Sequence, residues 1–97
     1  MKNDNPLERD IESKVREFAL KQGLLCYKFT SPSKRSVPDR MFVNPGGRVW
    51  FIEFKRRGEK PTASQAVEIA KLQKQGVTVH VVDNVEDGKR IVVEESL

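Results

Sequence analysis

Apolar and polar positions alternate along the chain with two different periods, which predicts both helices and strands. Between Leu7 and Leu20 the apolar residues recur at three- and four-residue spacing, so we expect a first helix over residues 6–22, ended by Gly23. The aromatic and β-prone run LLCYKFT then predicts a strand over residues 24–30. The run SPSKRSVP that follows has no apolar period and predicts a loop.

The second half of the chain predicts a hairpin, a helix and a further strand. Strand-like runs at residues 41–43 and 48–54 flank the turn sequence NPGG, which is typical of a β-hairpin. Beyond the break RRGEKPT, Thr62 or Ser64 is expected to cap a second helix that ends at Gly76. VTVHVV predicts a strand over residues 77–82. The tail from residue 83 fits a short helix or an edge strand, and we favour the helix.

This order of elements, αβββαβ with a short closing element, predicts an α/β fold in which helices flank a mixed sheet. A chain of 97 residues has room for one modest core, so we expect a single domain over residues 1–97. No apolar run approaches the roughly 18 residues of a membrane span, and the first ten residues lack the apolar stretch of a signal peptide. We therefore expect an intracellular protein without a membrane partner.

Composition narrows the chemistry further. The net charge of +4 and the pI near 9.4 favour a polyanionic partner such as DNA. Cys26 is the only cysteine, which excludes an intrachain disulfide and a thiolate cluster, and we expect it to be a small buried residue in a strand. His80 lies inside a predicted strand with no ligand partner spaced nearby, so we expect it to be structural.

Two carboxylates and a lysine in the hairpin are the strongest candidates for chemistry. In a strand, Glu53 and Lys55 share one face. Folding the hairpin about its turn places Asp39 beside Ile52 or Glu53, and Pro38, which cannot donate to a ladder, puts Asp39 near the sheet margin. Carboxylates this close repel each other unless one is protonated or a cation lies between them. Mg²⁺ or Mn²⁺, which prefer oxygen ligands, would satisfy such a site.

A divalent ion held there would activate water and stabilise charge on phosphoryl oxygens. Lys55 would position or deprotonate the attacking water, or neutralise the developing charge. This predicts metal-dependent hydrolysis of phosphodiesters. An E-x-K triplet alone is common on solvated strand faces, and an aspartate after proline is often only a turn residue. The combination of both with a hairpin of suitable length is what makes the pattern informative.

The residues Pro38-Asp39 and Glu53-Phe54-Lys55 resemble the signature of the PD-(D/E)xK nuclease superfamily. More narrowly, SVPD at 36–39, WFIEFK at 50–55, GEKPTASQ at 58–65 and LQKQGV at 72–77 resemble the VRR-NUC (virus-type replication-repair nuclease) family. The resemblance implies a restriction-endonuclease-like core and a nuclease that depends on Mg²⁺ or Mn²⁺, with no small-molecule cofactor. One departure is Ser36, where the family usually has glycine.

The resemblance also implies residue roles. Asp39 and Glu53 would bind the metal, the backbone carbonyl of Phe54 would add a ligand, and Lys55 matches the catalytic lysine. Gln65 matches a family glutamine that would orient a water or contact the phosphate.

Related enzymes use a further glutamate on the first helix for metal binding and catalysis. Glu12 fits this role best and Glu8, one turn earlier, is the alternative, whereas an ordinary exposed helix glutamate remains a third interpretation of Glu12.

The predicted function is a structure-specific DNA endonuclease of phage or bacterial origin. It would act on branched DNA as a Holliday-junction-resolving homodimer, because two symmetric cuts need two sites. The alternatives are a general nuclease, a nuclease directed by a partner helicase or restriction system, and an inactive nucleic-acid-binding module. The basic residues expected to hold the phosphate backbone are Lys28, Lys34, Arg35, Arg40, Arg56, Arg57 and Lys60.

Overall fold

A computed structural model describes residues 7–97, which form three helices and four strands. The tail folds as a helix, so the favoured interpretation is confirmed and the edge-strand alternative is wrong. In chain order the elements are α1 (Glu8–Lys21), β1 (Leu25–Lys28), β2 (Arg40–Val43), β3 (Val49–Phe54), α2 (Ala63–Lys74), β4 (Val79–Val82) and α3 (Val85–Glu95).

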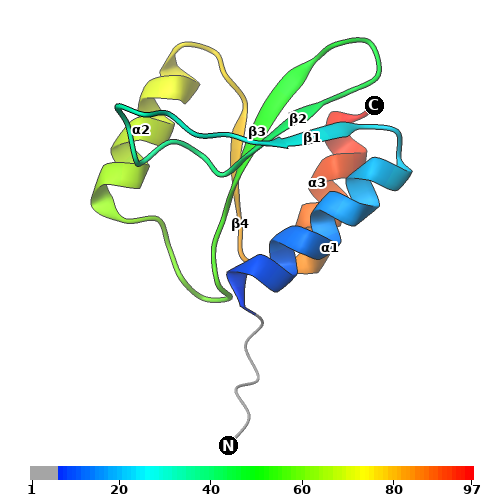
Figure 1. The fold of residues 1–97 in the computed structure, drawn as a ribbon, viewed down its shortest axis with the longest axis horizontal. Coiled ribbons are helices and arrows are strands. Elements are labelled where there is room, and N and C mark those ends of the chain that lie inside the picture. The colour runs from blue at the N-terminus through cyan, green and yellow to red at the C-terminus, as the bar shows by residue number, and fades with distance from the viewer. Residues whose placement is uncertain (1–6) are drawn as a thin grey trace, which may run out of the picture.

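The four strands form one mixed sheet in the order β1-β2-β3-β4. β1, β2 and β3 pair antiparallel, and β4 pairs parallel to β3. Figure 1 shows α1 and α3 side by side on one side of the sheet and α2 on the other. The predicted α/β architecture, with helices flanking a mixed sheet, is therefore confirmed.

The hairpin register fixes the relation between the two predicted metal ligands. Arg40 pairs with Ile52 and Met41 with Phe51. The next pair along the same register is Asp39 with Glu53, which is one of the two registers that the sequence allowed. Because side chains alternate between faces, Asp39 and Glu53 stand on the same face of the sheet.

The main core lies between the sheet and the pair α1 and α3. Along α1 the buried residues Ile11, Val15 and Ala19 follow the helical period, as the sequence predicted. α3 approaches α1 closely at Gly88, where an added Cβ would overlap Cγ2 of Val15. A side chain at this position would push the two helices apart.

The helix ends follow local sequence signals. α1 begins at Glu8, whereas residue 6, where the sequence placed the start, lies outside the described residues. α1 is followed by Gly23 with a φ of 90°, a conformation that favours glycine. Thr62, not Ser64, caps α2, and Asn84 caps α3 by accepting a hydrogen bond from the backbone of Asp87.

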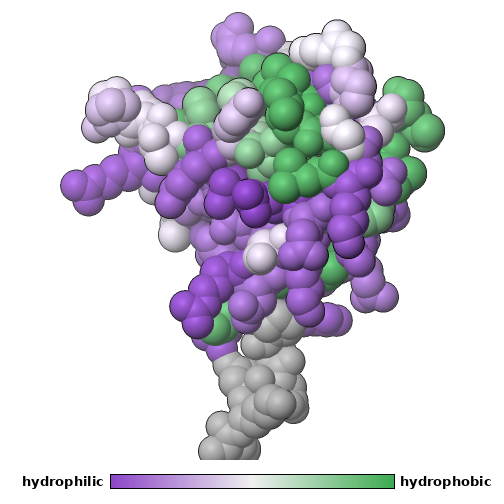
Figure 2. Space-filling view, turned by 45° about the vertical axis from the view of Figure 1, so that its right-hand side comes forward, coloured by the Kyte–Doolittle hydropathy of each residue, from purple (hydrophilic) through white to green (hydrophobic). Residues whose placement is uncertain are grey.

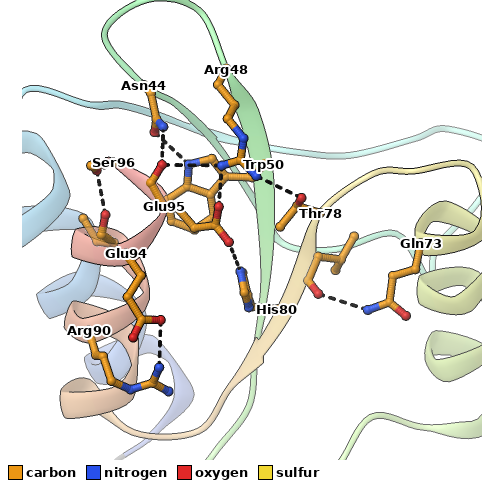
Figure 3. A network of polar contacts seen from close by, with 12 residues as sticks. Asn44, Arg48, Trp50, Gln73, Thr78, His80, Arg90, Glu94, Glu95 and Ser96 are labelled. Atoms are coloured by element: carbon orange, nitrogen blue, oxygen red, sulfur yellow. Dashed lines mark hydrogen bonds and ion pairs between the residues drawn. The ribbon is translucent and has the colours of Figure 1, made fainter.

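A polar network ties the hairpin end of the sheet to the end of α3 (Figure 3). The indole of Trp50 donates to Asn44 at 2.8 Å, and the Asn44 amide donates to the backbone carbonyl of Glu95 at 2.7 Å. The Glu95 carboxylate pairs with Arg48 and lies 2.6 Å from Nε2 of His80. This contact gives His80 a structural partner, in line with its predicted role.

No helix within residues 7–97 is long and apolar enough to cross a membrane. Cys26 lies in β1 as predicted, but it is only partly buried, because β1 is an edge strand.

Candidate active site

The predicted site lies where β3 ends, next to the residues that lead into β2 and the first turn of α1 (Figure 1). Glu53 is the penultimate residue of β3, Lys55 follows the strand, and Asp39 directly precedes β2. Glu53 is only 2% exposed and Lys55 12%. The hairpin therefore brings three of the predicted catalytic residues into one largely buried cluster.

Asp39 is held in place by the backbone on both sides. Its Oδ2 accepts a hydrogen bond from the backbone N–H of Phe54 at 3.0 Å. Its own backbone carbonyl accepts from the N–H of Phe29 at 2.8 Å, which extends the β1–β2 ladder by one residue. Burial raises the pKa of Asp39, and the hydrogen bond from Phe54 partly offsets that effect. Asp39 is thus a fixed carboxylate with Oδ1 free of hydrogen bonds within the described residues.

Glu53 is the most perturbed acid of the site. Burial, followed by the negative charge of Asp39, raises its pKa from the ordinary 4.5 to about 7, against the opposing charge of Lys55. The Lys55 ammonium Nζ lies 3.6 Å from Oε2 of Glu53. The other oxygen, Oε1, is buried and has no hydrogen-bond partner within residues 7–97. A buried carboxylate oxygen of this kind requires a proton or a cation beside it.

The two candidate glutamates of α1, Glu8 and Glu12, differ in their interactions. Glu12 forms an ion pair with Arg40, which sequence analysis had assigned to DNA binding. Burial and then the charge of Asp39 raise the pKa of Glu8. Glu8 in turn contributes to the raised pKa of Glu53. Glu8, the alternative in the sequence analysis, is therefore electrostatically coupled to both hairpin carboxylates. Glu12 also raises the pKa of Asp39, but it is paired with Arg40.

The residues present fit a divalent cation. Within residues 7–97 no group of three or more His, Cys, Asp or Glu side chains is arranged to hold a metal ion by itself. Asp39 and Glu53 nevertheless supply the oxygen ligands that Mg²⁺ and Mn²⁺ prefer, and Mg²⁺ is commonly held by one or two carboxylates together with water and substrate phosphate. The unpaired buried Oε1 of Glu53 is the observation that favours such a cation.

Gln65 has a role that the sequence analysis missed. Its side-chain oxygen accepts a hydrogen bond from the backbone N–H of Thr62 at 2.9 Å, and the Thr62 hydroxyl accepts from the backbone N–H of Gln65 at 3.2 Å. This is a capping box at the start of α2. The T-x-x-Q spacing in the sequence was the signal that could have revealed it. The Gln65 amide nitrogen remains available for a water or a phosphate.

Five of the seven predicted DNA-binding cations lie on two loops beside the site, and Lys28 and Arg40 lie in β1 and β2. Lys34 and Arg35 belong to the loop before β2, and Lys28 ends β1. Arg56, Arg57 and Lys60 follow β3. Apart from Arg40, none of the seven forms an ion pair within residues 7–97.

The loop before β2 is hydrogen-bonded to the start of α2, which follows the second loop. The hydroxyl of Ser36, in the loop before β2, donates to that of Ser64 in the first turn of α2 at 3.0 Å. Figure 2 shows that the surface near the start of the described chain is mostly hydrophilic, whereas apolar residues gather farther from it. Lys28, Lys34 and Arg35 line one pocket with Asp39 and form no ion pair within residues 7–97, an arrangement suited to a phosphate backbone.

Comparisons with known proteins agree with this chemistry. The chain is 42% identical over 81 residues to "Putative nuclease p44" of Acyrthosiphon pisum secondary endosymbiont phage 1, covering 84% of this chain and 83% of the relative. A solved structure described as "VRR_NUC domain" superposes with a TM-score of 0.84 at 25% identity, covering 89% of this chain and 94% of that one. No protein-family model matches the chain.

Proposed function

Because the chain belongs to the VRR-NUC family of nucleases, we propose that it is a divalent-metal-dependent endonuclease that cuts branched DNA. The observation that carries the metal dependence is the buried Glu53. Its Oε1 has no hydrogen-bond partner within the described residues, and burial together with the charge of Asp39 raises its pKa to about 7. A buried acid and a half-buried acid that repel each other support a cation site more than a purely structural role, because a structural carboxylate is normally hydrogen-bonded.

The roles of the side chains follow from their positions. Asp39 and Glu53 would hold Mg²⁺ or Mn²⁺, assisted by the backbone carbonyl of Phe54, with Glu8 completing the acidic set from α1. The bound ion would supply Lewis-acid stabilisation of the phosphoryl oxygens and lower the pKa of water. Glu12 would act through Arg40, because their ion pair fixes the start of β2 directly after Asp39.

Lys55 would stabilise the negative charge that develops on the phosphate. Its ammonium lies 3.6 Å from Glu53 and is 12% exposed, so it is largely shielded from water. A positive charge in such an environment acts more strongly than one in bulk solvent. The Gln65 amide nitrogen would donate to a water or a phosphate oxygen while its oxygen caps α2.

A homodimer that resolves four-way junctions is part of the proposal, because one chain offers a single cluster and a junction needs two symmetric cuts. The exposed edge strand β1 supports it, since Leu25 and Tyr27 are each about half exposed on that strand. Edge strands with exposed apolar residues are suited to association.

The proposal is tested by cleavage of linear, flapped and four-way DNA with Mg²⁺, Mn²⁺ or EDTA. We expect cleavage only with metal, and paired incisions near the branch point of the four-way junction. Asp39→Asn should abolish cleavage and also remove the increase in melting temperature that Mn²⁺ gives the wild-type protein without DNA. Cleavage in EDTA, or an Asp39→Asn protein that still cuts and still responds to Mn²⁺, would refute the metal site.

Light scattering tests the proposed homodimer. A dimer at micromolar concentration is expected. A monomer that cuts linear and branched DNA equally would refute junction resolution and leave a general nuclease, and cutting only in the presence of a helicase or restriction partner would indicate the partner-directed alternative. Binding of DNA without any cleavage would instead indicate an inactive binding module.

A further inference from the structure

A pocket of about 290 Å³ opens beside Asp39, between the end of β1 and the loop before β2. Its lining combines three cations with two apolar side chains. The cations are Lys28, Lys34 and Arg35, and the apolar residues are Phe29 and Val37. This mixture matches a nucleotide, which carries a negative phosphate and a flat apolar base face.

Phe29 stands on the same face of the sheet as the acids. Its backbone N–H donates to the carbonyl of Asp39, so the two residues are opposite each other in the extended ladder. Its ring packs against Phe51 with a centroid separation of 4.9 Å and a tilt of 59°. The ring is therefore supported from the sheet side while it also lines the pocket, as a stacking platform requires.

The cations of the pocket are available for a phosphate. Lys28, Lys34 and Arg35 form no ion pair within the described residues. The backbone N–H of Lys34 bonds to the carbonyl of Ser31 at 3.3 Å, which closes a turn in this loop. Lys34 and Arg35 thus lie on a folded loop and Lys28 at the end of β1, and none of them forms an ion pair with the Asp39 carboxylate that also lines the pocket.

The size of the pocket limits its occupant. A volume of about 290 Å³ lies at the lower end of the range for small-molecule sites, so it admits one nucleotide unit and not a stacked duplex. A paired base must leave the duplex to enter such a pocket, whereas an unpaired nucleotide avoids that cost.

We propose that this pocket binds one unpaired nucleotide of the DNA next to the cleavage site, with its base against Phe29 and its phosphate against Lys34 and Arg35. Asp39 lines the pocket and is also a proposed metal ligand, so an occupant would place the neighbouring phosphodiester at the acids. The inference rests on the proposed function. It would explain why the enzyme prefers branch points, where nucleotides are most easily unpaired.

A binding experiment in EDTA tests the pocket without cleavage. Two duplexes are compared that differ only in one unpaired 2-aminopurine nucleotide, whose fluorescence falls when the base stacks. We expect the wild-type protein to bind the duplex with the unpaired nucleotide about tenfold more tightly than the paired one, since base–aromatic stacking is worth roughly that much or more. The emission of the unpaired 2-aminopurine should fall when the wild-type protein binds this duplex.

Phe29→Leu keeps an apolar side chain and removes the ring. This variant should lower the ratio of the two affinities to about twofold or less and remove the fall in emission, with circular dichroism verifying the fold. Lys34→Gln with Arg35→Gln should instead weaken binding of both duplexes and reduce the salt dependence.

Phe18→Leu is a matched control. Phe18 lines a second pocket of about 280 Å³ on α1 and α3, together with Lys14, Lys21 and Lys89, and this pocket shares no residue with the first. The Phe18→Leu protein should keep the wild-type ratio and the fall in emission.

Equal wild-type affinities for the two duplexes, or an unchanged ratio in Phe29→Leu, would overturn the pocket assignment. These outcomes are distinguishable from failure of the proposed function. A protein that shows the preference but never cleaves with Mg²⁺ or Mn²⁺ supports the pocket and refutes the nuclease mechanism, whereas one that cleaves without the preference refutes the pocket alone.

Discussion

Replacing Glu53 with glutamine should stabilise the metal-free protein at high pH. Burial and Asp39 raise the pKa of Glu53 from 4.5 to about 7. Between these values the folded protein binds more protons at Glu53 than the unfolded chain does, so the stability from this residue falls as the pH rises through the window. This contribution of Glu53 to the unfolding free energy is fully present below about pH 4.5 and fully lost above about pH 7.

The two pKa values set the magnitude. Their difference corresponds to about 3 kcal/mol, and because Glu53 is only 2% exposed, little of this is screened by solvent. Glutamine keeps the shape but carries no charge at any pH. Its gain over the wild type in unfolding free energy should therefore be about 2–3 kcal/mol larger at pH 8 than at pH 5.

Urea denaturation in EDTA at several pH values measures this difference. Glu17→Gln is a suitable control, because Glu17 is exposed and forms no ion pair within the described residues. Its difference from the wild type should not change with pH by more than about 0.5 kcal/mol. If the Glu53→Gln difference is also constant, or if it decreases towards pH 8, the account of Glu53 as a strained carboxylate is wrong.

Three further substitutions separate chemistry from architecture. Lys55→Met keeps most of the side-chain volume, so DNA binding should persist in gel-shift assays while single-turnover cleavage slows by roughly 10²-fold; equal losses in both would make Lys55 only a phosphate anchor. Gln65→Ala should lower the unfolding free energy by about 1 kcal/mol by breaking the capping box with Thr62, and should slow cleavage less than Lys55→Met does, while full activity would limit Gln65 to capping. Gly88→Ala should destabilise the fold by about 1–3 kcal/mol in thermal and urea unfolding, because the new methyl group overlaps Val15; a neutral effect would show that α1 and α3 separate easily.

The hairpin part of the site could be predicted because local rules fix it. The NPGG turn and the alternation of the flanking strands restricted the register to two possibilities, and both placed Asp39 close to Glu53. Apart from α3, where the sequence also allowed an edge strand, the type of each helix and strand followed from periodicity and from stop signals such as Gly23 and Gly76.

The contribution of α1 could not be predicted in the same way. Glu8 and Glu12 are one turn apart and lie on the same side of the helix, so periodicity cannot separate them. The choice depends on where α1 lies against the sheet, which is set by tertiary packing that the sequence does not reveal; the close contact of Val15 with Gly88 of α3 is one example of such packing. The pairing of Glu12 with Arg40 likewise depends on tertiary contacts.

Glu95 and Glu53, at opposite ends of the sheet, differ in their hydrogen bonds and in the direction of their pKa shifts. This contrast is the strongest structural argument for a functional Glu53. Burial alone would raise the pKa of Glu95, but hydrogen bonds from His80 and Arg48 outweigh it and lower that pKa. At the other end, Glu53 is more deeply buried, has an oxygen without a partner, and has a raised pKa. The same small fold thus pairs the partly buried Glu95 with two basic side chains, whereas Oε1 of the buried Glu53 has no hydrogen-bond partner within residues 7–97. Because an unpaired buried oxygen destabilises the folded protein, its presence beside Asp39 and Lys55 is best explained by a ligand that binds there, and the sign of the pH dependence in Glu53→Gln tests that explanation directly.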